Sequence, residues 1–203
     1  MVINNILEKI FSAPSNVTLL RALNERTIGI SGREAARITG LSLRTVQVSL
    51  SNLENTGVVK RFAGNREHLF IFNRKNYLAK NLLDNLFIAE TKYRQDVFKI
   101  IKLKLKNASH SIILFGSAAR GSDNLKSDLD ICLVYKPPKN KIEELVADLR
   151  TELSAVFSIS FAPFYLTAAQ FKEYGLNKKP LVNNIINDGK IICGKSFKEL
   201  LDG

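Results

Sequence analysis

The sequence predicts an α+β protein built from three parts, and three observations support this fold class. Residues 1–74 combine helical patterns with a short hairpin, and residues 75–107 contain no proline or glycine but carry apolar residues at helical spacing. In residues 108–203, apolar strand patterns alternate with helical patterns. We therefore expect an N-terminal helical domain, a helical linker and a C-terminal domain with a small mixed sheet.

Positive charge is concentrated in the first half of the 203-residue chain. The formal net charge is +11, and residues 1–107 hold 18 of the 30 Lys and Arg but only 8 of the 19 Asp and Glu. A basic half joined to a nearly neutral half favours a polyanion as the partner of the basic half. A generally basic protein remains the alternative, because charge alone does not specify a partner.

No targeting or membrane-spanning segment is apparent in the sequence. No apolar run approaches the roughly 20 residues that a membrane-spanning helix needs. The N-terminus is amphipathic and carries Glu8, unlike a signal peptide, so we expect a cytoplasmic protein. Cys132 and Cys193 lie far apart, and we expect them to pack as small hydrophobic residues in strands.

Residues 31–57 read SGREAARITGLSLRTVQVSLSNLENTG and predict two helices joined by a short turn. Ser31 and Glu34 have the spacing of a capping box at a helix start. Gly40 can adopt the left-handed conformation that ends this helix, and Ser42 can cap the next one. The second helix is expected to bury Val46, Leu50 and Leu53.

A hairpin is predicted directly after these helices. VVKRF (58–62) and HLFIF (68–72) read as strands, and Gly64-Asn65 supplies the turn between them. Residues 1–74 therefore resemble the winged helix-turn-helix domains of bacterial and archaeal transcriptional regulators.

The resemblance implies binding to double-stranded DNA, with the second helix in the major groove and the hairpin wing on phosphates. A module for dimer or protein contacts is the alternative. The candidate DNA-binding residues are Arg44, Thr45, Gln47 and Ser51 on the helix, and Lys60, Arg61 and Arg66 on the wing.

Residues 75–107 predict one or two helices that link the two halves. Lys99, Lys102 and Lys106 fall on one stripe of the last helix, where they form either a solvated face or additional phosphate contacts. The apolar stripe of the same segment can pack within the chain or between the protomers of a homodimer.

The stretch FGSAARGSDNLKSDLD, residues 115–130, contains the candidate chemistry of the second half. Gly116 and Ser117 lie where a strand (111–116) gives way to a helix. A residue without a β-carbon lets a phosphate approach the helix-start amides, and the Ser117 hydroxyl can donate another hydrogen bond. The guanidinium of Arg120 can bind a phosphate as a planar fork.

Asp128 and Asp130 lie two residues apart in the predicted strand 127–135. Side chains alternate faces along a strand, so both carboxylates should project the same way. Two close carboxylates repel each other unless a cation binds between them, and Mg²⁺ is commonly held by one or two carboxylates and substrate phosphates. Two solvated aspartates are the alternative.

The spacing of Gly116-Ser117, ten residues, then Asp128-Leu129-Asp130 resembles the GS-x10-D-x-D signature of the DNA polymerase β-like nucleotidyltransferase superfamily, in its minimal branch. The wider pattern of the family also includes Arg120 and Ser127. The resemblance implies that Gly116, Ser117, Arg120 and Ser127 bind an NTP, with ATP the first choice. It also implies that Asp128 and Asp130 are catalytic and bind Mg²⁺.

The chain departs from the family pattern at a third carboxylate, which active members usually carry on a later strand. The candidate strand here, VFSISFAPFYL (156–166), follows a helix predicted over 139–154 and contains no Asp or Glu. Its polar side chains before Tyr165 are Ser158 and Ser160. A nucleotide can therefore bind without transfer, or transfer can be slow and depend on a partner.

Two functions follow from these patterns. The first is a DNA-binding transcriptional regulator with a Mg–nucleotide-binding domain. The second is an active nucleotidyltransferase that transfers NMP to a protein, RNA or small-molecule hydroxyl, including the antitoxin of a pair with a HEPN-type toxin. A structural adaptor that binds neither ligand would leave the Asp128/Asp130 pair unexplained.

Overall fold

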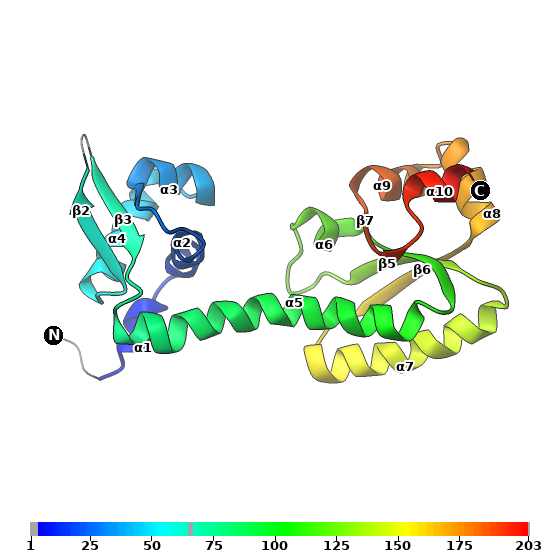
Figure 1. Ribbon diagram of the computed structural model, residues 1–203, viewed down its shortest axis with the longest axis horizontal. Helices are drawn as coiled ribbons and strands as arrows, with labels where there is room; N and C mark the ends of the chain where they lie inside the picture. The colour runs from blue at the N-terminus through cyan, green and yellow to red at the C-terminus, as the bar shows by residue number, and fades with distance from the viewer. Residues whose placement is uncertain (1–3, 65–66, 203) are drawn as a thin grey trace. The chain divides into compact units, whose positions relative to one another are not determined.

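The computed structural model describes residues 4–64 and 67–202, and its contacts divide the chain into two compact units, Met1–Lys92 and Tyr93–Gly203 (Figure 1). Each unit has its own buried core, and each is described by itself. Among the described residues, no helix combines the length and apolar character needed to cross a lipid bilayer.

The first unit has the predicted pair of helices followed by a hairpin. Three antiparallel strands form its sheet in the order β1-β3-β2. Its elements before the long helix are α1 (Ile6–Ile10), α2 (Pro14–Asn24), β1 (Ile30–Ser31), α3 (Gly32–Thr39), α4 (Leu43–Asn55), β2 (Val59–Ala63) and β3 (His68–Phe72). This arrangement is a winged helix-turn-helix, with α4 in the place of the recognition helix and the β2–β3 hairpin as the wing.

The predicted capping residues shape the turn between α3 and α4. The Ser31 hydroxyl accepts a hydrogen bond from the Glu34 amide at 3.3 Å, and the Ser42 hydroxyl accepts one from the Thr45 amide at 3.1 Å. Gly40 ends α3 in the left-handed conformation, with φ of 70°. Each cap satisfies a backbone amide that has no partner inside its helix.

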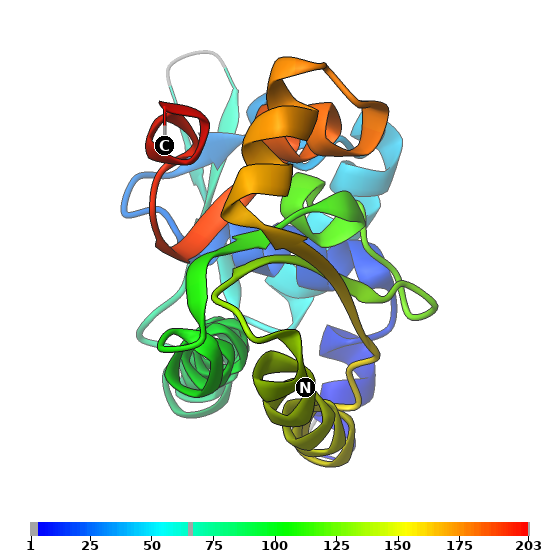
Figure 2. The same cartoon turned by 90° about the vertical axis from the view of Figure 1, so that its right-hand side faces the viewer.

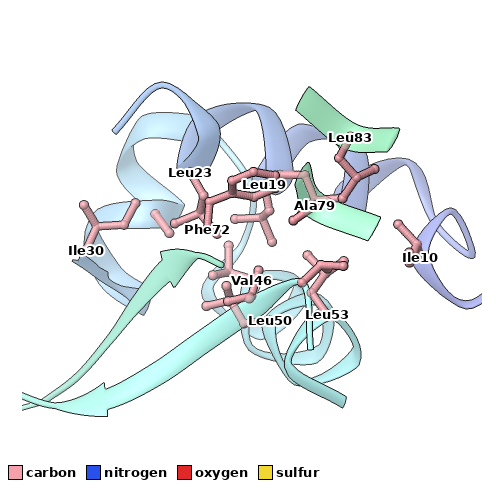
Figure 3. Close-up of a cluster of buried hydrophobic side chains, with 14 of the residues drawn as sticks. Ile10, Leu19, Leu23, Ile30, Val46, Leu50, Leu53, Phe72, Ala79 and Leu83 are labelled. Carbon is pink, nitrogen blue, oxygen red and sulfur yellow. The ribbon is translucent and has the colours of Figure 1, made fainter. Parts of the chain in front are cut away.

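The core of the first unit gathers around the apolar face of α4 (Figure 3). Val46, Leu50 and Leu53 are buried there as predicted, and Leu19 and Phe72 pack against the same cluster. Full burial of one such side chain contributes roughly 1.5–3 kcal/mol relative to leaving it in water. This burial holds α4 in place and leaves its polar face outside.

The segment predicted as a linker contributes to both cores. A π-helical turn, η1 (Ala79–Leu83), leads into the 22-residue helix α5 (Asp84–Leu105), and the boundary between the units falls inside α5. Side chains from η1 and the start of α5 are buried in one cluster, and side chains from the end of α5 in another. Ala79, Leu83 and Phe87 belong to the first core, and Val97, Ile101 and Leu105 belong to the second.

The second unit contains a four-stranded mixed sheet in the order β6-β5-β4-β7, in which only the β5–β6 pair is parallel. Its elements after α5 are β4 (Ser109–Leu114), α6 (Gly116–Arg120), β5 (Leu129–Tyr135), α7 (Lys139–Phe157), β6 (Phe161–Thr167), α8 (Ala168–Leu176), α9 (Pro180–Asp188), β7 (Lys190–Gly194) and α10 (Phe197–Asp202). The predicted α+β fold class is therefore confirmed.

Helices cover both faces of this sheet (Figures 1 and 2). Ile131 and Leu133 of β5 face a cluster shared with α5 and α7, whereas Cys132 and Val134 face a cluster shared with α8, α9 and α10. This alternation follows from the period of two along a strand. Both cysteines are free and lie in strands, as expected, and burial raises the pKa of the Cys132 thiol to about 12.

The prediction of an extended segment over 156–166 is wrong at its start. Helix α7 continues through Val156 to Phe157, Ser158 adopts a left-handed conformation with φ of 55°, and β6 begins only at Phe161. Backbone hydrogen bonds from the Ser158 and Ile159 amides close the end of this helix, and Tyr93 packs against its last residue. The Tyr93 hydroxyl donates to the Phe157 carbonyl at 2.9 Å, and the two rings meet edge to face with centroids 5.5 Å apart.

Candidate functional site

Gly116 lies directly against the carboxylate of Asp130. It follows β4 with φ of 69°, and a β-carbon there would overlap with Asp130 Oδ2. The neighbouring Phe115 amide donates to the Asp130 carbonyl at 3.1 Å, which fixes the two strand ends against each other. A glycine is required at 116 both for the backbone conformation and for this close approach.

Asp130 is the second residue of β5, and Asp128 lies just before the strand, so the predicted strand start at Ser127 is two residues too early. Asp128 is exposed and Asp130 is half-buried. Burial raises the pKa of Asp130, the Asp128 charge raises it further, and Arg120 lowers it. The two carboxylates therefore sense each other, as expected for a pair that gains from a bound cation.

The other predicted nucleotide-binding residues surround this pair. Arg120 ends α6 and also lies 3.8 Å from Asp188, so its charge is shared between two carboxylates. The Ser127 hydroxyl accepts a hydrogen bond from the Asn124 amide at 3.0 Å and thereby shapes the turn before β5. Ser117, in the first turn of α6, is half-buried.

A pocket of about 510 Å³ adjoins Asp128. Sequence reasoning identified two of its lining residues, Ser127 and Asp128, but missed the rest. The missed residues are Tyr93, Ala118, Asp123, Asn124, Leu125, Leu129, Phe157, Ser158 and Ile159. No local pattern could have found Tyr93, because it comes from α5, far upstream of the motif. The pocket offers apolar and aromatic surface next to a carboxylate pair.

The position beside Asp130 on the neighbouring strand is occupied by Ala162. The parallel register pairs these two residues, and side chains paired in this way share one face of the sheet. The Leu129 amide donates to the Ser160 carbonyl at 2.8 Å, so the serine precedes β6 beside Asp128. Within residues 4–64 and 67–202, no group of three or more His, Cys, Asp or Glu side chains could hold a metal ion.

Two aspartates together fit one Mg²⁺ that is also bound by phosphate oxygens, since Mg²⁺ often takes only one or two protein carboxylates. They do not by themselves form an all-protein metal cage.

On the first unit, the candidate DNA-binding residues of α4 fall into two groups. Arg44, Gln47 and Ser51 are exposed. Thr45 is half-buried, and its hydroxyl lies 2.8 Å from that of Ser42, so it belongs to the N-terminal cap of the helix. The structure thus brings three of the four predicted side chains onto the open face.

The wing residues also differ from one another. Lys60 is exposed, whereas Arg61 pairs with Glu54 at 3.1 Å, which neutralises part of its charge. Arg66 lies outside the described residues. A groove of about 360 Å³ between α4 and the wing is lined by Gln47, Arg61 and also Arg33. Sequence reasoning missed Arg33 because it belongs to the first helix of the pair.

Comparisons with known proteins add the following findings. Residues 98–198 match the family model described as "Polymerase beta, Nucleotidyltransferase". No curated protein matches the chain.

Three solved structures are similar to parts of the chain. The transcriptional repressor BigR from Xylella fastidiosa shares 21% identity over 42% of this chain and 82% of its own, with a TM-score of 0.36. A toxin–antitoxin with AMP-PNP shares 16% identity over 52% of this chain and 81% of its own, with a TM-score of 0.37. A mutant of the toxin–antitoxin MntA-HpeT shares 14% identity over 53% of this chain and 80% of its own, with a TM-score of 0.38.

Proposed function

The second unit of the chain carries a nucleotidyltransferase domain of the polymerase beta family, and from this premise we propose that the protein is a DNA-binding regulator that responds to a Mg–nucleotide. The observation that carries the proposal is the Asp128/Asp130 pair, in which Asp130 packs against Gly116 and Asp128 lines a pocket of about 510 Å³. The winged helix-turn-helix of the first unit supplies the second half of the proposal.

Asp128 and Asp130 would hold the metal ion together with the phosphates of an NTP, for which ATP is the first candidate. When bound, Mg²⁺ neutralises phosphate charge and acts as a Lewis acid. Arg120 lies within electrostatic reach of Asp130 and can add a cationic fork to the phosphates. The absence of a side chain at Gly116 lets the Asp130 carboxylate lie against the backbone at the start of α6.

The surroundings of the two aspartates favour binding of an NTP over transfer of NMP to an acceptor. Ala162 occupies the place beside Asp130 on β6, and this strand contains no carboxylate. A metal that activates an attacking hydroxyl would therefore have fewer ligands than a metal held jointly by the aspartates and the triphosphate. The nucleotide would then act as a signal that the first unit converts into a change in DNA binding.

An active nucleotidyltransferase is the second candidate, because both aspartates and the Gly-Ser step are intact. Its acceptor would be a hydroxyl of a protein, an RNA or a small molecule, and a HEPN-type toxin would be one such protein. The pocket next to Asp128 offers space for an acceptor as well as for a nucleobase.

Calorimetric titration with each NTP and Mg²⁺, followed by an α-phosphate label-transfer assay, tests both candidates. We expect the wild type to bind an NTP only with Mg²⁺ and to transfer no label, and the Asp128→Asn, Asp130→Asn double variant to lose this binding. Retained binding in the variant would place the nucleotide elsewhere. Label transfer that the variant loses would make the protein an enzyme.

A further inference from the structure

Four lysines gather at the end of the second unit's sheet that lies opposite Asp130. Lys136 follows β5, Lys195 follows β7, and Lys102 and Lys106 lie in and just after the last turns of α5. Asp130 lies near the start of β5, whereas Lys136 comes after its last residue, so a full strand separates the lysines from the candidate nucleotide site. We call these four lysines the basic patch.

Backbone hydrogen bonds bring Lys136 and Lys195 to the start of β4, which follows the end of α5, where Lys102 and Lys106 lie. The Lys195 amide donates to the His110 carbonyl at 3.0 Å, and the Lys136 amide donates to the Ala108 carbonyl at 2.9 Å. Ala108 directly precedes β4, and His110 is its second residue, so both acceptors lie close to the end of α5. The patch is therefore built by segments of one compact unit, and its geometry does not depend on a flexible loop alone.

The charges of the four lysines shift the pKa values of two neighbouring side chains, His110 and Cys193. Burial lowers the pKa of His110, and the charges of Lys136 and Lys195 lower it further. On the adjacent strand, burial raises the pKa of the Cys193 thiol, while Lys102 and Lys106 oppose this shift. All four lysines therefore contribute to one positive field over the start of β4 and the end of β7.

The lysines of the basic patch form no ion pair with acidic side chains in the described part of the chain. By contrast, Lys104 of the same helix pairs with Glu152 at 2.6 Å. Glu199 is the acid that interacts with Lys195, and hydrogen bonds from Ser196 and the Lys195 charge lower its pKa. One carboxylate against four lysines leaves the basic patch with a net positive charge.

We propose that the basic patch binds the phosphate backbone of DNA, at phosphates additional to those contacted by the winged helix-turn-helix. Lysine is a compact, hydrated charge that suits phosphates but reads no sequence. Lysine is also depleted in the cores of protein–protein interfaces, which disfavours a protein partner. The inference rests on the proposed DNA binding of the first unit and adds a second, sequence-independent contact.

The test compares salt dependence on short and long DNA, with the full-length protein throughout. Duplexes of about one and about three helical turns, roughly 10 and 30 base pairs, are titrated at several salt concentrations. The patch variant is Lys102→Gln with Lys195→Gln. The control is Lys178→Gln with Lys190→Gln, which removes the same charge from exposed residues of the same unit outside the basic patch.

On the long duplex, we expect the slope of log K against log salt to be less steep by about 1.8 in the patch variant, because each phosphate contact contributes about 0.9. The control should keep the wild-type slope, and the short duplex should not distinguish the proteins. Equal slopes in the wild type and the patch variant, or an equal loss in the control, would overturn the inference. Failure of the wild type to bind either duplex would instead overturn the proposed function.

Discussion

Gly116 and Asp130 are the residue pair on which the candidate nucleotide site depends. The glycine has a positive φ, and the carboxylate lies against its α-carbon so closely that no side chain fits between them. A side chain at 116 would therefore displace the carboxylate that is proposed to hold the metal ion. Gly116 is therefore constrained both by its backbone conformation and by its contact with Asp130. Comparison with a glycine that has only the first constraint separates the two effects.

Gly116→Ala should abolish Mg²⁺-dependent NTP binding. The alanine is strained at positive φ by about 1–2 kcal/mol and also displaces the Asp130 carboxylate. Gly121→Ala is the matched control, since Gly121 has φ of 72° but no atom within 4 Å of the place where a β-carbon would lie. Titration calorimetry should show binding by the control only. Equal binding by both variants would mean that the contact with Asp130 is irrelevant to the ligand.

The apo protein should become more stable when Asp130 loses its charge. Burial and Asp128 raise the pKa of Asp130 above its ordinary value, so the folded state holds this proton more tightly than the unfolded state. The stability that this proton contributes is present below the unfolded pKa and is lost as pH rises through the folded pKa.

Asp130→Asn should therefore raise the midpoint of thermal unfolding at pH 7 in the presence of a chelator. The difference in unfolding midpoint between the variant and the wild type should become smaller as the pH is lowered toward the ordinary pKa of an aspartate. At saturating Mg²⁺ and NTP, the wild type should instead have the higher unfolding midpoint, because the ligands stabilise only the wild type. A variant that is less stable than the wild type without metal would show that the carboxylate makes a favourable contact in the apo protein.

At the scale of elements, α4 is the helix whose sequence pattern bears most directly on the proposed DNA binding. Its caps and its buried stripe could be predicted, because both depend on residues close together in the chain. Arg44, Gln47 and Ser51 are exposed as a consequence of that burial. The sequence did not reveal that the Thr45 hydroxyl is used by the cap at Ser42.

Arg44→Ala should weaken DNA binding by about 1–3 kcal/mol and relax base preference at one position. The guanidinium is exposed on the open face of α4, so its loss should leave the fold intact. Arg94→Ala, an equal charge change at an exposed residue of α5, is the control. Fluorescence anisotropy on a selected site and its single-base variants measures both effects. Unchanged affinity and preference in Arg44→Ala would mean that α4 is not the recognition helix.

Elements that depend on distant contacts were harder to predict. The last residue of helix α7, Phe157, is held by Tyr93, which is 64 residues away in sequence. Arg33 joins Gln47 and Arg61 at one groove only after α3 packs against α4 and the wing. The Gly-Ser step and the aspartate pair could be predicted from spacing alone, but the pocket beside them depends on separate segments that the chain folds together.

At the scale of the whole molecule, the chain contains two cores that share one continuous helix. Leu50 is buried in the first core and Leu153 in the second. The polymerase beta family match covers residues of the second unit alone, and the winged helix-turn-helix lies entirely within the first. Binding of DNA and binding of nucleotide should therefore be separable by damage to one core.

Leu50→Ala should lower the free energy of unfolding of the first unit by about 2–5 kcal/mol. Nucleotide affinity should stay at the wild-type value, whereas DNA affinity should fall. Leu153→Ala is the reciprocal variant: nucleotide affinity should fall, whereas affinity for a short duplex, which the basic patch does not contact, should stay at the wild-type value. Hydrogen exchange resolves the stability of each unit, and calorimetry gives the nucleotide affinity. Loss of nucleotide binding in Leu50→Ala would show that the two units fold as one.

The most direct test of the regulator is the affinity for DNA with and without Mg²⁺ and the NTP that binds. A coupled protein should show a change of about 5- to 150-fold, which corresponds to roughly 1–3 kcal/mol of coupling free energy. The Asp128→Asn, Asp130→Asn double variant should bind DNA with one affinity under both conditions. An identical DNA affinity of the wild type with and without its bound nucleotide would contradict the account.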